Sequence, residues 1–241
     1  MRKHLLIIFL LASFTLSAQD FHFRFGANLA NLVLRTDTDN DPVNQYVVRP
    51  MFGLAFEAPI TDKLIFRPEF LYSEKGLKIR PRTGKYPQSS FRLGYLEAPL
   101  FFSFNTKISK DNRFMLDIGP YFALGFTGSY KTVTYDFNRS VKTTKGMVVY
   151  YNEVDDAKIE KIEDDVFILK RVDFGFKFGF GFQFKTVSVH SFYSRGFVNT
   201  IPKVTATGYE QNKDREYNSV ITLALGFLLN EKKESEGVDG L

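Results

Sequence analysis

The sequence predicts an all-β protein, an eight-stranded antiparallel up-and-down transmembrane β-barrel with short periplasmic turns and long extracellular loops. The first observation is the stretch 172–185, VDFGFKFGFGFQFK, in which phenylalanine alternates with other residues. Successive side chains of a strand point to opposite faces, so the rings share one face. A wall between lipid and a narrow hydrated interior requires such a strand. The predicted lipid-facing ladder comprises Phe174, Phe176, Phe178, Phe180, Phe182 and Phe184.

The second observation is the length of the connections between eight candidate strands, which alternate long and short along the chain. A barrel with both termini in the periplasm predicts this asymmetry. The alternative is a soluble sandwich or lipocalin-like barrel. That alternative does not require alternating connections, and it would turn the phenylalanine face inward. No helix-period segment and no repeat of about 20–50 residues competes with the barrel.

Composition excludes several other classes. The chain has no cysteine, which excludes disulfides and thiol chemistry, and the 27 phenylalanines and 12 tyrosines suit a lipid-facing band with aromatic girdles. The net charge of +5 is spread without a basic block, so no nucleic-acid partner is expected. No cofactor is predicted.

Three segments divide the chain. Residues 1–18 resemble a signal peptide, with Arg2 and Lys3 before an apolar run and cleavage expected near Ala18. An uncleaved anchor is the alternative, but the apolar run is too short to span a bilayer. Residues 19–230 form the predicted barrel domain in the bacterial outer membrane, and 231–241 a polar, disordered tail.

The first four strands follow from alternation of apolar and polar residues at 21–29, 48–60, 64–75 and 91–104. Residues 61–63 are predicted to form a tight turn, and 35–45 and 76–90 to form loops. Pro68 and Pro99 are unusual inside strands and predict bulges or broken ladder bonds.

The last four strands are predicted at 113–126, 172–184, 187–197 and 217–229. The strand at 187–197 could face either way, because His190 with Phe192 and Val189 with Tyr193 both fit the outer face. The longest connection, 131–170, contains strand-like pieces at 131–137, 147–151 and 166–169. We therefore expect the strands on both sides of it to extend beyond the membrane, with an extra hairpin.

Charged side chains fall on the predicted inward positions of several strands. An eight-stranded barrel is only wide enough for side chains to fill, and buried charges must be paired or solvated. This predicts a closed, salt-bridged interior, and the alternative is a narrow polar pathway. Lys177 must point inward, with Glu97 or Asp117 as its expected partner, while Gly175, Gly179 and Gly181 leave room for charged side chains. The predicted network comprises Arg24, Glu57, Arg67, Glu69, Glu97, Asp117, Asp173 and Lys177.

Two other features invite a chemical interpretation. His190 lies close to Ser188, Ser191 and Ser194, but neighbouring residues of a strand face opposite ways, so a structural histidine is expected and no catalytic residue is assigned. The acidic stretch 153–165 lacks the glycine of an EF-hand loop, which favours a solvated surface over a metal site. The surrounding loop, 131–170, is the expected contact for envelope or secretion-system proteins.

Several segments together carry a family resemblance: RPEFLYSEKGLK (67–78), YLEAPLFF (95–102), LDIGPYFALGF (116–126), VDFGFKFGFGF (172–182), FYSRGFVN (192–199) and LALGFLLN (223–230). The chain resembles the PorT-like outer-membrane β-barrels of Bacteroidetes-type bacteria. The resemblance implies an eight-stranded outer-membrane barrel. The family's namesake is an accessory of a protein-secretion system, but the shared motifs are strand motifs, so no functional residue is carried over.

The sequence thus predicts an integral outer-membrane protein that is not an enzyme. Its predicted role is a structural or interaction module with a side-chain-filled interior, accessory to protein secretion or envelope assembly. The alternative is a small passive pore or a ligand-binding barrel for small solutes.

Overall fold

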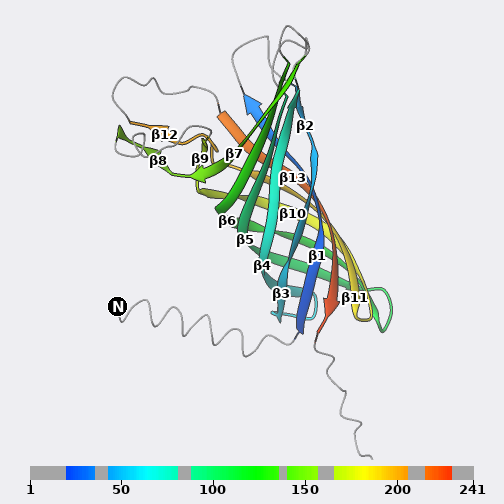
Figure 1. The fold of residues 1–241 in the computed structure, drawn as a ribbon. Coiled ribbons are helices and arrows are strands. Elements are labelled where there is room, and N and C mark those ends of the chain that lie inside the picture. The colour runs from blue at the N-terminus through cyan, green and yellow to red at the C-terminus, as the bar shows by residue number, and fades with distance from the viewer. Residues whose placement is uncertain are drawn as a thin grey trace, which may run out of the picture.

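The computed structural model describes residues 20–35, 43–80, 88–135, 140–156, 166–205 and 215–229. Eight of its strands close into a ring in which every neighbouring pair is antiparallel (Figure 1). The predicted barrel fold is therefore confirmed. In ring order the strands are β1 (Asp20–Arg35), β3 (Val47–Pro59), β4 (Leu64–Arg80), β5 (Gln88–Lys107), β6 (Asn112–Tyr135), β10 (Val172–Phe184), β11 (Val187–Gly196) and β13 (Arg215–Leu228), which pairs with β1.

The two ends of the barrel differ in their connections (Figure 1). Short turns at 60–63, 108–111 and 185–186 lie at the end where β1 begins and β13 finishes. In the first turn, the hydroxyl of Thr61 accepts a hydrogen bond from the Leu64 amide at 3.0 Å. The long connections lie at the opposite end, which is therefore extracellular. In the part of the chain described, no helix is long and apolar enough to cross a membrane.

Several strands are longer at their extracellular ends than the sequence predicts. The predicted loop 76–90 is wrong in part, because β4 continues to Arg80 and β5 begins at Gln88. Likewise β2 (Val43–Gln45) pairs with β4 inside the predicted loop 35–45, and β13 begins at Arg215. Beyond the hydrocarbon layer outward polar residues cost nothing, so apolar alternation no longer identifies these strand ends.

The longest connection forms an extra hairpin, as predicted. Strand β6 separates from β10 after Leu124 and continues as far as Tyr135 in a hairpin with β7 (Val141–Tyr150). The expected extension of the following strand is wrong, because residues 166–169 form a separate strand, β9 (Val166–Leu169), that runs parallel to β7. Two short strands, β8 (Glu153–Val154) and β12 (Lys203–Val204), also pair in parallel nearby.

Both prolines break ladders, as predicted. The β4–β5 register stops at the pair Pro68–Leu100 and resumes at Leu71–Glu97, so two residues of each strand are unpaired in this ladder. The β5–β6 register is interrupted in the same way after Pro99. Proline has no N–H to donate, so β4 loses ladder bonds at Pro68 and β5 loses them at Pro99.

The alternation of side chains is regular around the ring except at a bulge between β5 and β6, where the consecutive residues Phe126 and Thr127 are both exposed. The phenylalanine ladder of β10 projects outward, and the open question about β11 is settled because Ser188 and His190 are buried while Val189 is exposed. A side chain at Gly175, Gly179 or Gly181 would collide with Tyr121, Phe192 or His190 respectively. The glycines therefore make room for aromatic rings, and the prediction that they make room for charged side chains is wrong. The predicted signal peptide, 1–18, and tail, 231–241, lie outside the described residues.

Candidate functional site

The interior of the barrel is the candidate site, because it gathers charged side chains from most of the ring strands. The structure places all eight residues of the predicted network there, and none of them is more than 4 % exposed. Inward and outward positions alternate along each strand, so one row of side chains from each strand reaches this space.

The half nearer the periplasm contains a chain of contacts that begins at Arg24. The Arg24 guanidinium lies 2.8 Å from the Glu69 carboxylate. The Arg67 guanidinium lies 3.2 Å from the same carboxylate and 2.7 Å from the carboxylate of Asp117. Asp117 also accepts a hydrogen bond from the Ser103 hydroxyl and lies 3.3 Å from the His190 imidazole. Strands β1, β4, β6 and β11 are thereby connected across the interior.

The half nearer the extracellular side is organised around Glu97. Lys177 contacts one of its carboxylate oxygens, and Lys75 lies 2.9 Å from the other. Lys75 also lies 3.2 Å from Asp173, which accepts hydrogen bonds from Tyr121 at 3.1 Å and Asn218 at 2.8 Å. Of the two partners predicted for Lys177, it is Glu97 that makes the contact.

Two cations of the interior, Lys75 and Arg113, are not among the residues predicted for the network. Lys75 continues the inward row of Arg67 and Glu69 on β4, and it is the last residue of the predicted strand 64–75, so the alternation of that strand indicates its inward position. Arg113 lies close to the first residue of β6, where no alternation precedes it. With them, the ion pairs of the described interior join five cations (Arg24, Arg67, Lys75, Arg113, Lys177) and five carboxylates (Glu57, Glu69, Glu97, Asp117, Asp173). Equal numbers of opposite charges let each charge find a partner.

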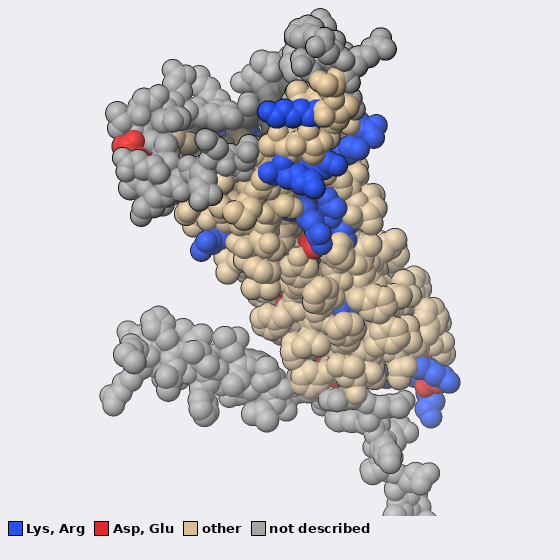
Figure 2. Space-filling view, in the orientation of Figure 1, with Lys and Arg blue, Asp and Glu red and all other residues tan. Residues whose placement is uncertain are grey.

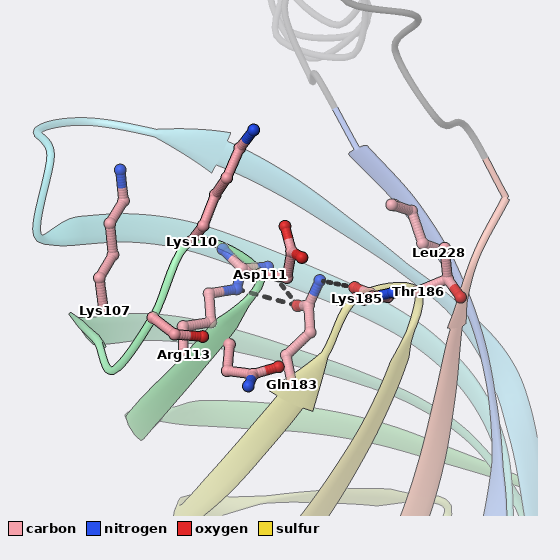
Figure 3. A pocket seen from close by; sticks show the side chains of 10 residues that line it. Lys107, Lys110, Asp111, Arg113, Gln183, Lys185, Thr186 and Leu228 are labelled. Atoms are coloured by element: carbon pink, nitrogen blue, oxygen red, sulfur yellow. Dashed lines mark hydrogen bonds between the residues drawn. The ribbon is translucent and has the colours of Figure 1, made fainter.

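The periplasmic end is closed by a hydrogen-bonded layer. Arg113 lies 2.5 Å from Glu57 and donates to the Gln183 side-chain oxygen at 2.9 Å, while Gln183 donates to the Lys185 carbonyl at 2.8 Å. Outside this layer lies a pocket of about 470 Å³ between two periplasmic turns (Figure 3). In Figure 3 Arg113 and Gln183 point toward one another, whereas Lys107 and Lys110 extend away from them.

The extracellular end is closed by an apolar cap, which we define as the buried cluster of Leu32, Leu77, Phe91, Leu93, Tyr95, Tyr121, Ala123, Val148, Tyr150 and Leu169. Strand β7 contributes Tyr150, whose hydroxyl donates to the Thr127 carbonyl at 3.1 Å and whose ring packs edge-on against Tyr95. Strand β9 contributes Leu169. The long connection therefore covers the interior with side chains of its own.

The chemistry available in this interior is charge pairing. His190 is 1 % exposed, and its ring stacks on Phe192, so a dissolved substrate does not reach it. Within the described ranges, no group of three or more histidine, aspartate or glutamate residues could hold a metal ion. Most of the predicted acidic stretch, from residue 157 to 165, lies outside those ranges.

Comparison with known proteins identifies the family. The model of a family described as outer membrane protein beta-barrel domain matches residues 17–201, which is most of the chain. The chain belongs to this family. Its members are barrels of the bacterial outer membrane, and this places the chain there. No curated protein matches the sequence.

Solved structures with a similar fold share little sequence with this family member. They include OprG from Pseudomonas aeruginosa, with 10 % identity over 89 % of this chain and 98 % of that chain at a TM-score of 0.46. The attachment invasion locus protein Ail of Yersinia pestis has 10 % identity over 87 % and 97 %, with a TM-score of 0.37. Neisserial surface protein A has 10 % identity over 86 % and 96 %, with a TM-score of 0.39.

Replacing Glu97 by Gln tests the interior pairing. The substitution removes the ion-pair partner of Lys177, whereas Lys75 keeps Asp173. The uncompensated buried charge of Lys177 should lower the free energy of unfolding by about 3–5 kcal/mol. The double variant Glu97→Gln/Lys177→Gln should lose less than Glu97→Gln alone. Urea unfolding of the barrel in lipid vesicles measures the free energy of unfolding of Glu97→Gln, Lys177→Gln and the double variant. A double variant whose loss equals the sum of the losses of the two single variants would contradict the pairing.

Proposed function

We propose that this protein is a non-enzymatic structural or interaction module of the outer membrane, accessory to protein secretion or envelope assembly. The observation that carries the proposal is the sealed interior. Its charged side chains are at most 4 % exposed apart from Arg113 in the periplasmic layer, and a pore would need a continuous file of water past them. A filled barrel is a rigid support for whatever its extracellular end binds.

The extracellular hairpin supports the interaction role. Strands β6 and β7 project beyond the ring, and Val141 and Met147 on β7 leave large apolar surface exposed. Strand β9 is the edge of the sheet among the described strands, and edges accept further strands. We therefore assign partner binding to residues 131–170, with envelope or secretion-system proteins as partners. The resemblance to PorT-like barrels supports the same class of partner.

The alternative function is a ligand-binding barrel for small solutes. It is favoured by a pocket of about 700 Å³ on the extracellular side, lined by Tyr150, Tyr151, Asn152, Glu153, Lys170, Arg171, Val172 and Lys203. The pocket adjoins the apolar cap at Tyr150. Its basic residues would favour an anionic solute, and such binding is compatible with a closed barrel.

Conductance measurements distinguish a sealed barrel from a passive pore. The purified full chain, inserted into a planar lipid bilayer, should give no steady single-channel current, because both closures and the charged layers exclude a water path. An open eight-stranded barrel would conduct ions. Reproducible steps of current that scale with the number of inserted molecules would contradict the proposal.

Deleting residues 138–165 tests the partner-binding role. No ring pairing involves β7, so the shortened chain should still insert and migrate as a heat-modifiable barrel. Chemical cross-linking in intact outer membranes should then lose the adducts that the full chain forms. The matched control is Phe180→Leu on the outer wall, which should keep them. Adducts that survive the deletion would refute the assignment of this segment.

A further inference from the structure

The outer wall carries a group of basic side chains beyond its apolar band, which we call the outer basic patch: Lys78, Arg80, Arg92, Lys131 and Lys145. The strand register aligns Lys78, Ser90, Lys131 and Lys145 in one row across β4, β5, β6 and β7. Their neighbours along each strand, such as Leu77, point into the apolar cap, so the row points outward. Figure 2 shows Lys and Arg side chains gathered high on this wall, above a band nearly free of charge.

One carboxylate faces outward on the described parts of these four strands, and it holds Arg92 in place. Glu74 accepts hydrogen bonds from Arg92 Nε at 2.7 Å and Nη2 at 2.6 Å, and from the Tyr72 hydroxyl at 2.8 Å. Glu74 is buried, whereas the Arg92 side chain is 59 % exposed. No ion pair among the described residues engages Lys78, Arg80, Lys131 or Lys145, so the patch has a positive excess.

A shallow pocket adjoins Arg92. It has a volume of about 230 Å³ and is lined by Tyr72, Glu74, Arg92 and four small residues, Gly94, Thr127, Gly128 and Ser129. The small residues leave the strand surface open beside the fixed guanidinium. A planar guanidinium suits a phosphate, because it donates two parallel hydrogen bonds to the phosphate oxygens.

The depth of the patch relative to the bilayer follows from β5. Leu96 is exposed on the apolar outer wall, and Arg92 lies four residues further toward the extracellular end. Four residues of strand span about 13 Å, or about 10 Å along the membrane normal at the usual tilt of such barrels. Tyr72, which is paired with Leu96 in the ladder, packs against Phe126, as in an aromatic girdle. The patch therefore lies among the headgroups of the outer leaflet.

We propose that the outer basic patch binds the phosphorylated headgroup of a glycolipid in the outer leaflet of the outer membrane. Arg92 contacts a phosphate, the pocket beside it accepts the adjoining sugar, and Lys78, Lys131 and Lys145 surround the remaining anionic groups. Lysines close to an anionic membrane surface each strengthen binding by about fivefold at low salt. The lipid-facing wall below the patch accommodates the acyl chains.

Binding of purified bisphosphorylated lipid A to the full chain in neutral detergent micelles tests the proposal. The variant Lys78→Gln/Lys131→Gln/Lys145→Gln should bind this probe about tenfold or more weakly than the unmodified chain. The matched control, Lys107→Gln/Lys110→Gln/Lys185→Gln, removes the same charge at the periplasmic end and should bind as tightly as the unmodified chain. Dephosphorylated lipid A should bind the unmodified chain at least tenfold more weakly.

Three results would overturn the proposal. Equal losses in the two triple variants would mean that net charge alone attracts the lipid. Equal affinity of the unmodified chain for lipid A and for dephosphorylated lipid A would mean that the patch does not contact a phosphate. Inorganic phosphate that binds as tightly as lipid A would identify a site for a soluble anion. Heat-modifiable migration checks that each variant is folded. The single variant Lys131→Gln, with an expected loss of about fivefold, replaces a triple variant that does not fold.

Discussion

Closure of eight strands into a ring is the constraint on which the rest of the structure depends. A closed ladder leaves no sheet edge in the wall, but it confines all inward side chains to a space that they fill. Charges buried in that space must be paired or hydrogen-bonded, because an isolated buried charge is costly. The carboxylates of Glu69 and Glu97 satisfy this requirement, since each of them contacts two cations.

The ion pairs also connect strands that are distant in sequence, so they form only when the strands of the ring are in the correct register. Lys75 on β4 reaches Glu97 on β5 and Asp173 on β10, and Arg67 on β4 reaches Asp117 on β6. A shift of any strand by one residue would turn its charged row toward lipid. The network therefore fixes the register. It gives the extracellular hairpin and the outer basic patch a rigid support.

Most of the wall strands and many interior residues can be predicted from the sequence. Their side chains alternate with a period of two, because lipid lies on one side of the wall and crowded side chains lie on the other. Phe174 to Phe184 and the partner glycines are sufficient to orient β10. The apolar alternation weakens where the lipid ends, so it does not identify the extracellular ends of β4 and β5, which fall in the predicted loop 76–90. The cap depends on parallel pairing of β9 with β7, which no local pattern in residues 166–169 indicates.

Reaction of single cysteines with a membrane-impermeant thiol reagent tests the central claim, the sealed interior, most directly. The natural chain has no cysteine, so each introduced thiol reports one position. Thr222 and Ala123 are buried in the interior, whereas Lys110 lies exposed in a periplasmic turn. In lipid nanodiscs, Thr222→Cys and Ala123→Cys should stay unlabelled while Lys110→Cys reacts rapidly. Labelling of the interior cysteines at a rate close to that of Lys110→Cys would contradict a sealed barrel.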